Sequence, residues 1–166
     1  MKKKSYDKKE FAYLLEQNKR IIHKVSILYT NNKEDKEDLF QEICLQLWRS
    51  YSSYREEALF STWMYRVAIN TAVSQVRKRK NMVIPVEKFQ EKEDDTYCYE
   101  KDEKIQLLYK AIALLNKIDR AIILLWLEEK KYEEISDILG ISKSNVSIKL
   151  VRIKQNLSEI MKGLEK

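Results

Sequence analysis

A stretch near the carboxyl end of the sequence combines residue types that contact DNA. It runs from Tyr132 to Lys154 as YEEISDILGISKSNVSIKLVRIK, and it contains no acid after Asp137. Polar and basic residues stand where a second helix would present its outer side: Lys143, Ser144, Ser147, Lys149 and Arg152. Such side chains hold phosphates or hydrogen-bond to base edges in the major groove. The pattern therefore indicates DNA binding rather than covalent chemistry.

The middle of this stretch carries the signals of a tight turn between two helices. Gly140 can adopt the positive φ that ends a helix, and Ser142 is a good N-cap for the next one. Ser136 is small where two helices must cross closely. Four apolar residues are expected to anchor the two helices in the core: Ile135, Leu139, Val146 and Leu150. We predict a helix-turn-helix, whose second helix enters the major groove; an ordinary helical hairpin is the alternative.

A second acid-free stretch lies between Glu57 and Glu87. Its cations are Arg66, Arg77, Lys78, Arg79 and Lys80. Clustered cations are typical of nucleic-acid binding, although Lys and Arg also favour the last turns of helices through the helix dipole. Nearby aromatic residues offer stacking surfaces for unpaired bases: Tyr54, Phe60, Trp63 and Tyr65. For Phe60 and Trp63, a place in the core is the alternative.

Helices must position all of these residues. The sequence has two glycines and one proline, which is too little turn chemistry for a many-stranded sheet. Apolar residues spaced by three and four predict three helices before the middle of the chain, over about residues 7–29, 35–50 and 61–80. The same periodicity returns at Ile105. We predict an all-α fold of two small helical domains, a three-helix bundle and a C-terminal four-helix domain that contains the helix-turn-helix.

The segment between the two domains has a different composition. Residues 87–104 contain eight acids and four lysines with few aliphatic residues, and Pro85 precedes them. Proline cannot continue a helix, and a segment with so little apolar surface cannot form a core. We therefore predict domains at residues 1–81 and 105–166, joined by an exposed acidic linker over residues 82–104.

The composition also limits the class of function. A net charge of +6 favours a polyanionic partner. Cys44 and Cys98 form no metal-ligand pattern, and His23 is the single histidine. Without a Cys/His cluster or a glycine-rich phosphate loop, we expect no cofactor, no metal site and no enzymatic activity. No apolar run approaches the roughly 20 residues that span a bilayer, so we expect a cytoplasmic protein without membrane insertion.

Motifs in the first half of the chain carry a resemblance to a known family. Asp38-Leu-Phe-Gln-Glu leads to Leu47-Trp48, and Tyr54-Arg55 is followed by Phe60-Ser-Thr-Trp-Met-Tyr-Arg-Val-Ala-Ile-Asn70. With the helix-turn-helix behind them, these motifs resemble the sigma-70 family of transcription initiation factors, specifically its extracytoplasmic-function (ECF) group, over nearly the whole chain. The resemblance implies a sigma region 2 domain at residues 1–81 for core RNA polymerase binding and for recognition and melting of the −10 element. It implies a −35-binding sigma region 4 domain at residues 105–166.

The resemblance also implies a role for individual residues and a set of partners. Contacts to the β′ subunit of core RNA polymerase would come from Asp38, Gln41, Glu42 and Trp48. The −10 DNA would contact Tyr54, Arg55, Trp63, Tyr65, Arg66, Asn70, Arg77, Lys78, Arg79 and Lys80, and the loop over residues 54–62 would hold a flipped base. The −35 major groove would face Lys143, Ser144, Ser147, Lys149 and Arg152. The implied partners are the β and β′ polymerase subunits, promoter DNA and an anti-sigma factor.

Two residues depart from the family's pattern. Glu56 stands where members often have glycine after the arginine, which predicts a differently shaped base pocket. Ile148 stands where a small polar residue is common, and it is either buried or in contact with a thymine methyl group. Two other classes of function compare poorly with the sequence. A plain DNA-binding regulator needs neither the polymerase-binding helix nor the base-flipping loop, and an enzyme acting on nucleic acid needs an acid/base pair that we do not find.

Overall fold

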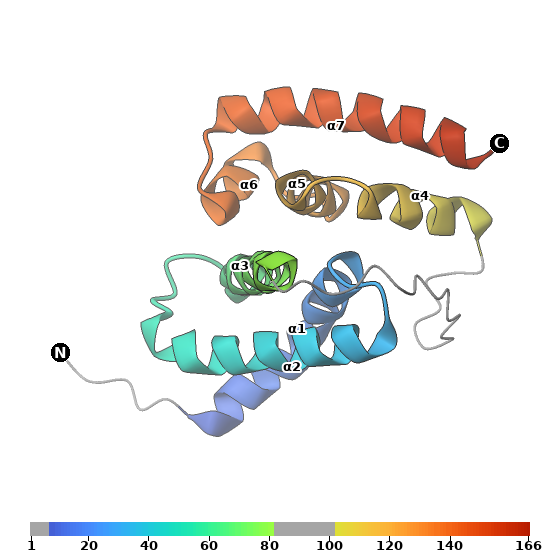
Figure 1. Cartoon of the computed structure of the whole chain (residues 1–166). Helices are drawn as coiled ribbons and strands as arrows, with labels where there is room; N and C mark the ends of the chain where they lie inside the picture. Colours follow the sequence, from blue (N-terminus) through green and yellow to red (C-terminus); the bar gives the residue numbers. More distant parts are fainter. Residues whose placement is uncertain (1–6, 82–101) are drawn as a thin grey trace. The chain divides into compact units, whose positions relative to one another are not determined.

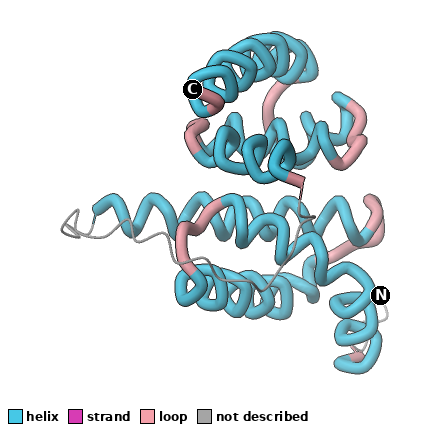
Figure 2. The backbone as a smooth tube through the Cα atoms, turned by 90° about the vertical axis from the view of Figure 1, so that its right-hand side faces the viewer, coloured by secondary structure: helices cyan, strands magenta, loops and turns pink. Residues whose placement is uncertain are grey.

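The structure, a computed structural model, describes residues 7–81 and 102–166 of the chain (Figure 1). These two ranges hold seven α-helices and one short 3-10 helix, and they contain no strand (Figure 2). The chain divides into two compact units, Met1–Val86 and Glu87–Lys166. The predicted all-α fold with two helical domains is confirmed. Most of the predicted linker, residues 82–101, lies outside the described residues, and α4 begins at Glu103.

The N-terminal unit is a bundle of three helices, each of which packs against the other two. They are α1 (Lys8–Leu28), α2 (Lys33–Ser50) and α3 (Phe60–Asn81), and the short 3-10 helix η1 (Tyr51–Ser53) follows α2. The core between them consists of apolar residues at helical spacing, which include Ile22, Val25, Leu39, Ile43, Leu47, Met64 and Ala68. Burial of these side chains is the main stabilising contribution to the bundle.

Side-chain caps decide where the first two helices begin. Asp7 accepts a hydrogen bond from the Lys9 amide at 2.9 Å, so α1 begins at Lys8. Asn32 accepts one from the Asp35 amide at 2.8 Å and is the N-cap of α2. The helix therefore begins two residues earlier than the apolar periodicity predicts, because the cap and the polar first turn carry no periodic signal.

The C-terminal unit contains α4 (Glu103–Ala113), α5 (Lys117–Leu127), α6 (Tyr132–Leu139) and α7 (Lys143–Leu164). The long helix α7 packs against the three others and extends over all of them in Figure 1. Its inner side is formed by Val146, Leu150, Ile153 and Leu157. The prediction that Leu139 anchors α6 is wrong, because Ile138 is the buried residue and Leu139 is only half-buried. Ile138 and Leu139 are three and four residues after Ile135, and both spacings fit the same side of a helix. The sequence alone therefore could not decide which of the two is buried.

Two reactive residue types are packed as ordinary side chains. The His23 ring lies 4.5 Å from the Phe40 ring, and burial, together with Lys19 and Lys36, lowers the pKa of the imidazole. The Cys44 thiol is half-buried, and burial raises its pKa. Over residues 7–81 and 102–166, no cluster of His, Cys, Asp and Glu could hold a metal ion. No helix in the same ranges is both long enough and apolar enough to cross a bilayer.

Candidate nucleic-acid interface

The turn between α6 and α7 has the geometry that its sequence predicts. Gly140 has a φ of 68° and ends α6, and its amide donates to the Ser136 carbonyl at 2.9 Å. The Ser136 hydroxyl also donates to the Ile141 carbonyl at 2.5 Å, which ties the end of α6 to the turn. Ser142 caps α7 by accepting from the Asn145 amide at 3.1 Å. Glycine, a capping serine and a short hydroxyl thus fix the direction in which α7 leaves the turn.

The predicted −35 residues all lie outside the packed side of α7. Lys143, Ser144, Ser147 and Arg152 are exposed, and Lys149 is half-buried. No acid occurs in α7 before Glu159. The outer side of the first four turns therefore carries cations and no acid, as a helix that approaches phosphates requires.

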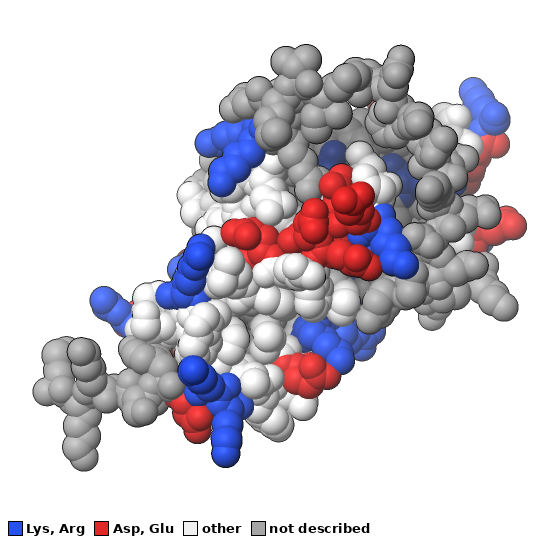
Figure 3. Space-filling model, turned by 60° about the horizontal axis from the view of Figure 1, so that its bottom comes forward, with Lys and Arg blue, Asp and Glu red and all other residues white. Residues whose placement is uncertain are grey.

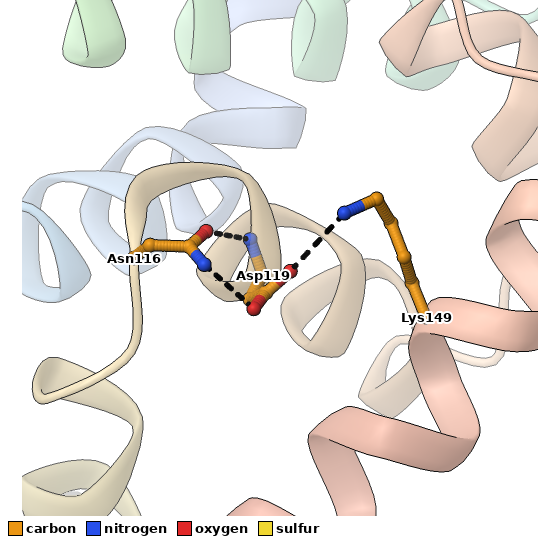
Figure 4. Close-up of polar contacts among 3 residues, drawn as sticks. All are labelled: Asn116, Asp119 and Lys149. Carbon is orange, nitrogen blue, oxygen red and sulfur yellow. Dashed lines mark hydrogen bonds and ion pairs between the residues drawn. The ribbon is translucent and has the colours of Figure 1, made fainter.

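Acids of neighbouring helices hold two of these lysines at the margins of α7. The Lys143 ammonium donates to Glu133 of α6 at 2.5 Å, and this hydrogen bond lowers the pKa of the Glu133 carboxyl. The Lys149 ammonium lies 3.9 Å from a carboxylate oxygen of Asp119 on α5 (Figure 4). Two hydrogen bonds to Asn116 fix Asp119. The Asn116 side-chain oxygen accepts from the Asp119 backbone amide at 2.9 Å, and the Asn116 side-chain amide donates to the Asp119 carboxylate at 2.7 Å. The sequence does not predict either ion pair, because the paired residues are 10 and 30 positions apart in the chain and only the tertiary fold brings them together.

Two apolar residues also stand on the outer side of α7. Ile148 is exposed, so of its two predicted states the buried one is wrong. Val151 is exposed as well, and our sequence analysis did not identify it. The sequence could have predicted this exposure, because Val151 directly follows Leu150 and so does not share the spacing of three or four that joins the buried residues of the helix.

Aromatic residues gather where α2, η1 and α3 meet. The Tyr54 and Trp63 rings lie 5.1 Å apart, and Phe60 lies 5.3 Å from Trp63 and 5.5 Å from Tyr54. All three side chains are half-buried against the buried ring of Tyr51. Each therefore contributes to the core and also keeps part of its surface exposed, so the two alternatives for Phe60 and Trp63 are not exclusive.

The loop between Tyr54 and the start of α3 is a closed turn. The Tyr54 hydroxyl donates to the Ala58 carbonyl at 2.8 Å across the loop. Glu56 has a φ of 58°, in the left-handed region that favours glycine. The backbone at this position thus has a conformation suited to glycine. Because glutamate occupies it in this chain, the backbone at Glu56 is locally strained.

The remaining predicted −10 residues divide between the surface and the core. Arg55 and four residues of α3 are exposed: Arg66, Asn70, Arg77 and Lys78. Tyr65 is 2% exposed and belongs to the core, so in this structure its ring offers no stacking surface to DNA. Tyr65 directly follows the buried Met64, and both side chains belong to the core. The side chains of Arg79 and Lys80 lie outside the described residues.

The predicted polymerase-binding residues lie along α2, which concentrates acids. Asp38, Gln41 and Trp48 are exposed and Glu42 is half-buried. Trp48 also packs against Phe11 of α1 with ring centroids 5.1 Å apart. In Figure 1, α2 runs along the lower part of its unit, and Figure 3, in which the bottom comes forward, shows several groups of acidic side chains, with an elongated acidic patch near the centre of the view.

A groove of about 680 Å³ joins this helix to α3. Asp38 and Glu42 line it from α2, and Asn70 and Lys78 line it from α3. Residues that the sequence assigned to two different partners, the polymerase and the −10 DNA, therefore face one space.

Comparison with known proteins gives the same two-part organisation. Residues 14–82 match the family model of Sigma-70 region 2, and residues 105–157 match that of Sigma-70, region 4. The chain is 28% identical over 160 residues to the RNA polymerase sigma factor SigV of Bacillus subtilis, with 92% of this chain and 91% of SigV covered. It is 29% identical over 174 residues to the ECF RNA polymerase sigma-E factor of Haemophilus influenzae, with 95% and 90% covered.

Solved structures agree at the level of the fold. The sigma factor RpoE of Bartonella quintana, in complex with the anti-sigma factor NepR, matches with a TM-score of 0.74 at 21% identity over 93% of this chain and 98% of that chain. CnrH, in complex with the cytosolic domain of CnrY, matches with a TM-score of 0.69 at 15% identity over 96% and 92%. Both regions of the family are present in order in this sequence, and the Haemophilus influenzae relative is an ECF factor. The chain belongs to the ECF group of the sigma-70 family.

Proposed function

We propose that this chain acts as an RNA polymerase sigma factor, which binds the core enzyme, recognises the −35 and −10 promoter elements and promotes DNA melting. The observation that carries the proposal is the combination of two units in one chain. One presents the acid-free outer side of α7, and the other presents the acidic α2 beside the exposed polar and basic residues of α3. A simple DNA-binding regulator would use the first unit and leave the second without a role.

In the C-terminal unit, α7 is the helix that would enter the −35 major groove. Helix-turn-helix proteins place the N-terminal residues of their second helix on base edges. Ser144 and Ser147 are short enough to approach the bases, while Lys143, Lys149 and Arg152 are suited to phosphates or guanine. The Ser142 cap and the Gly140 turn would set the angle of α7 to the DNA.

In the N-terminal unit, the aromatic cluster would receive an unpaired base of the −10 element. Extruding a base costs roughly a few kcal/mol, and stacking on protein aromatic rings offsets roughly 1–3 kcal/mol per base. Tyr54 and Trp63 keep part of their rings exposed for this purpose. The DNA backbone would follow exposed residues of the loop and of α3, namely Arg55, Arg66, Asn70, Arg77 and Lys78. From the sequence alone, we add Arg79 and Lys80 to this set.

The polymerase would bind along α2 through Asp38, Gln41, Glu42 and Trp48. The partner we propose is the β′ subunit, with the β subunit a further contact of the assembled enzyme. Asp38 and Glu42 line the same groove as Asn70, so a bound polymerase element and the −10 strand would lie next to each other. This proximity supports coupling between polymerase binding and promoter opening.

We further propose that the protein acts in the cytoplasm and that an anti-sigma factor regulates it. RpoE and CnrH, whose folds resemble this one, were solved in complexes, RpoE with the anti-sigma factor NepR and CnrH with the cytosolic domain of CnrY. A protein that covers α2 or α7 would block the proposed contacts to polymerase or to DNA.

Transcription in vitro tests the proposed function. The purified full chain is mixed with bacterial core RNA polymerase and genomic DNA fragments, and the 5′ ends of the transcripts are sequenced. We expect defined start sites, preceded by two shared sequence elements, only when the chain is present. An identical transcript pattern with and without the chain, together with no binding to the core enzyme, would contradict the proposal.

A further inference from the structure

The outer side of α7 carries two exposed apolar residues that the roles proposed so far leave unused. We propose that Ile148 and Val151 read thymines of the −35 element through their 5-methyl groups. This inference rests on the proposed function and specifies it, because it names the base type that the recognition helix selects. Of the four bases, only thymine presents a methyl group in the major groove.

The helix geometry places both residues opposite the core. Ile148 is two residues from both Val146 and Leu150, which are buried, and two residues correspond to about 200° around a helix. Ile148 is 52% exposed and Val151 is 56% exposed. With Ser144 and Ser147 they form the spacing i, i+3, i+4 and i+7, which is one stripe of a helix surface. Base-reading residues of homeodomain recognition helices have the same spacing.

The surrounding charges identify DNA as the occupant of this stripe. No acid occurs between Asp137 and Glu159, and Arg152 is exposed one turn after Ile148. A stripe with two apolar residues beside serines and cations complements a surface with methyl groups, hydrogen-bonding base edges and phosphates.

Partners within the unit also hold three of the four lysines of α7 away from this stripe. Lys143 bonds to Glu133, Lys149 lies 3.9 Å from Asp119, and the Lys154 ammonium lies 4.0 Å from the centre of the Trp126 ring. These contacts draw three long cationic side chains to the margins of α7. Ser144, Ser147, Ile148 and Val151 are therefore free of these three lysines, with Arg152 as the exposed cation beside them, and their short side chains can approach bases closely.

The test removes single methyl groups from the DNA. Promoters are first selected from a library with a randomised −35 region by the full chain assembled with bacterial core RNA polymerase. Each −35 thymine is then replaced by deoxyuridine, which lacks only the methyl group, and holoenzyme binding is measured. We expect at least one replacement to weaken binding about fourfold, equivalent to about 0.8 kcal/mol for one buried methyl group.

Variants assign the lost contact to the two residues. In Ile148→Ala or Val151→Ala, the same deoxyuridine replacement should have no further effect, because the partner of the methyl group is already absent. Leu164→Ala is the matched control, since Leu164 is an exposed apolar residue at the far end of the same helix. It should keep the full response to deoxyuridine. Circular dichroism confirms that each variant is folded.

Each outcome of the experiment is decisive. Selected −35 elements without thymine, or binding that deoxyuridine leaves unchanged, overturn the inference while the proposed function stands. Variants that keep the wild-type response to deoxyuridine overturn it as well, and they leave these two side chains as a surface for a protein. If the assembled chain selects no −35 sequence at all, both the proposed function and the inference fail.

Discussion

The two units use their surfaces differently. In the C-terminal unit, the proposed DNA contacts of α7 lie opposite the core residues of the same helix, so binding and packing are on separate sides. In the N-terminal unit, Tyr54, Phe60 and Trp63 are half-buried and share one cluster with the buried Tyr51. A binding surface that is also part of the core can be preorganised, but it cannot change without a cost in stability. We therefore expect function and stability to separate in the C-terminal unit and to change together in the N-terminal unit.

Replacing the central aromatic residue should have the largest effect. Trp63→Ala removes a ring that contacts three other rings, so we expect the free energy of unfolding to fall by about 2–3 kcal/mol, somewhat less than for a completely buried tryptophan. Promoter opening should also fall at least about tenfold if the ring stacks a base. Chemical denaturation and permanganate footprinting measure the two effects.

A conservative aromatic replacement separates the effect on stability from the effect on promoter opening. Trp63→Phe keeps much of the packing, so it should recover most of the stability while opening recovers less. Full recovery of opening together with stability would mean that the ring serves packing alone.

The acidic helix α2 provides the second comparison. Gln41→Ala with Glu42→Ala should weaken binding to core RNA polymerase about tenfold or more, as expected for two contacts of about 1 kcal/mol each at an interface. Stability should change by less than about 1 kcal/mol, because Gln41 is exposed and the half-buried Glu42 loses one hydrogen bond from Gln46. The matched control is Glu16→Ala with Gln17→Ala, which makes the same chemical changes on exposed positions of α1. Equal polymerase binding by both double variants would remove α2 from the proposed interface.

Salt dependence should distinguish two cations on α7. Arg152→Ala should lower the slope of log affinity against log salt by about one unit, because one phosphate contact is lost. Lys149→Ala should lower it less, since Asp119 already balances part of the lysine charge. Filter binding from 50 to 300 mM salt, a range of about 2.4-fold in Debye length, provides the slopes. A larger loss for Lys149 would show that its ion pair to Asp119 is broken on DNA.

Local signals allowed the sequence to predict most of the fold and part of the site. The turn at Gly140 and Ser142 depends on neighbouring residues, and the structure confirms it. The aromatic cluster was recognisable as a group, but the burial of Tyr65 was not, because helical spacing alone does not define the width of a core. The ion pair between Asp119 and Lys149 joins two helices that only the tertiary fold brings together.

Backbone strain at the end of α5 leads to a smaller prediction. Glu129 has a φ of 59°, and the Lys130 amide donates to the Leu125 carbonyl at 3.0 Å, which is the helix ending that usually has glycine. Glu129→Gly should therefore raise the free energy of unfolding by up to about 1 kcal/mol. Glu128→Gly is the matched control, because Glu128 has a φ of −83° and glycine there should be destabilising. Changes of the same sign in both variants would contradict this explanation.

The smallest predicted effect concerns pH and the packing of α1 against α2. Burial, then Lys19 and Lys36, lowers the pKa of His23 from its usual value of 6.5, so the folded state resists a proton that the unfolded chain accepts. The contribution of His23 to the free energy of unfolding should therefore be constant above about pH 7 and should fall as the pH drops below 6.5 towards the folded pKa. His23 is the single histidine, so His23→Gln should remove this part of the pH dependence and leave that of the carboxylates, which urea midpoints at pH 7.5 and 5.5 can measure. Identical shifts of the midpoint in both proteins would mean that the folded protein binds the proton of His23 as readily as the unfolded chain, and that the packing of the ring against Phe40 tolerates the charge.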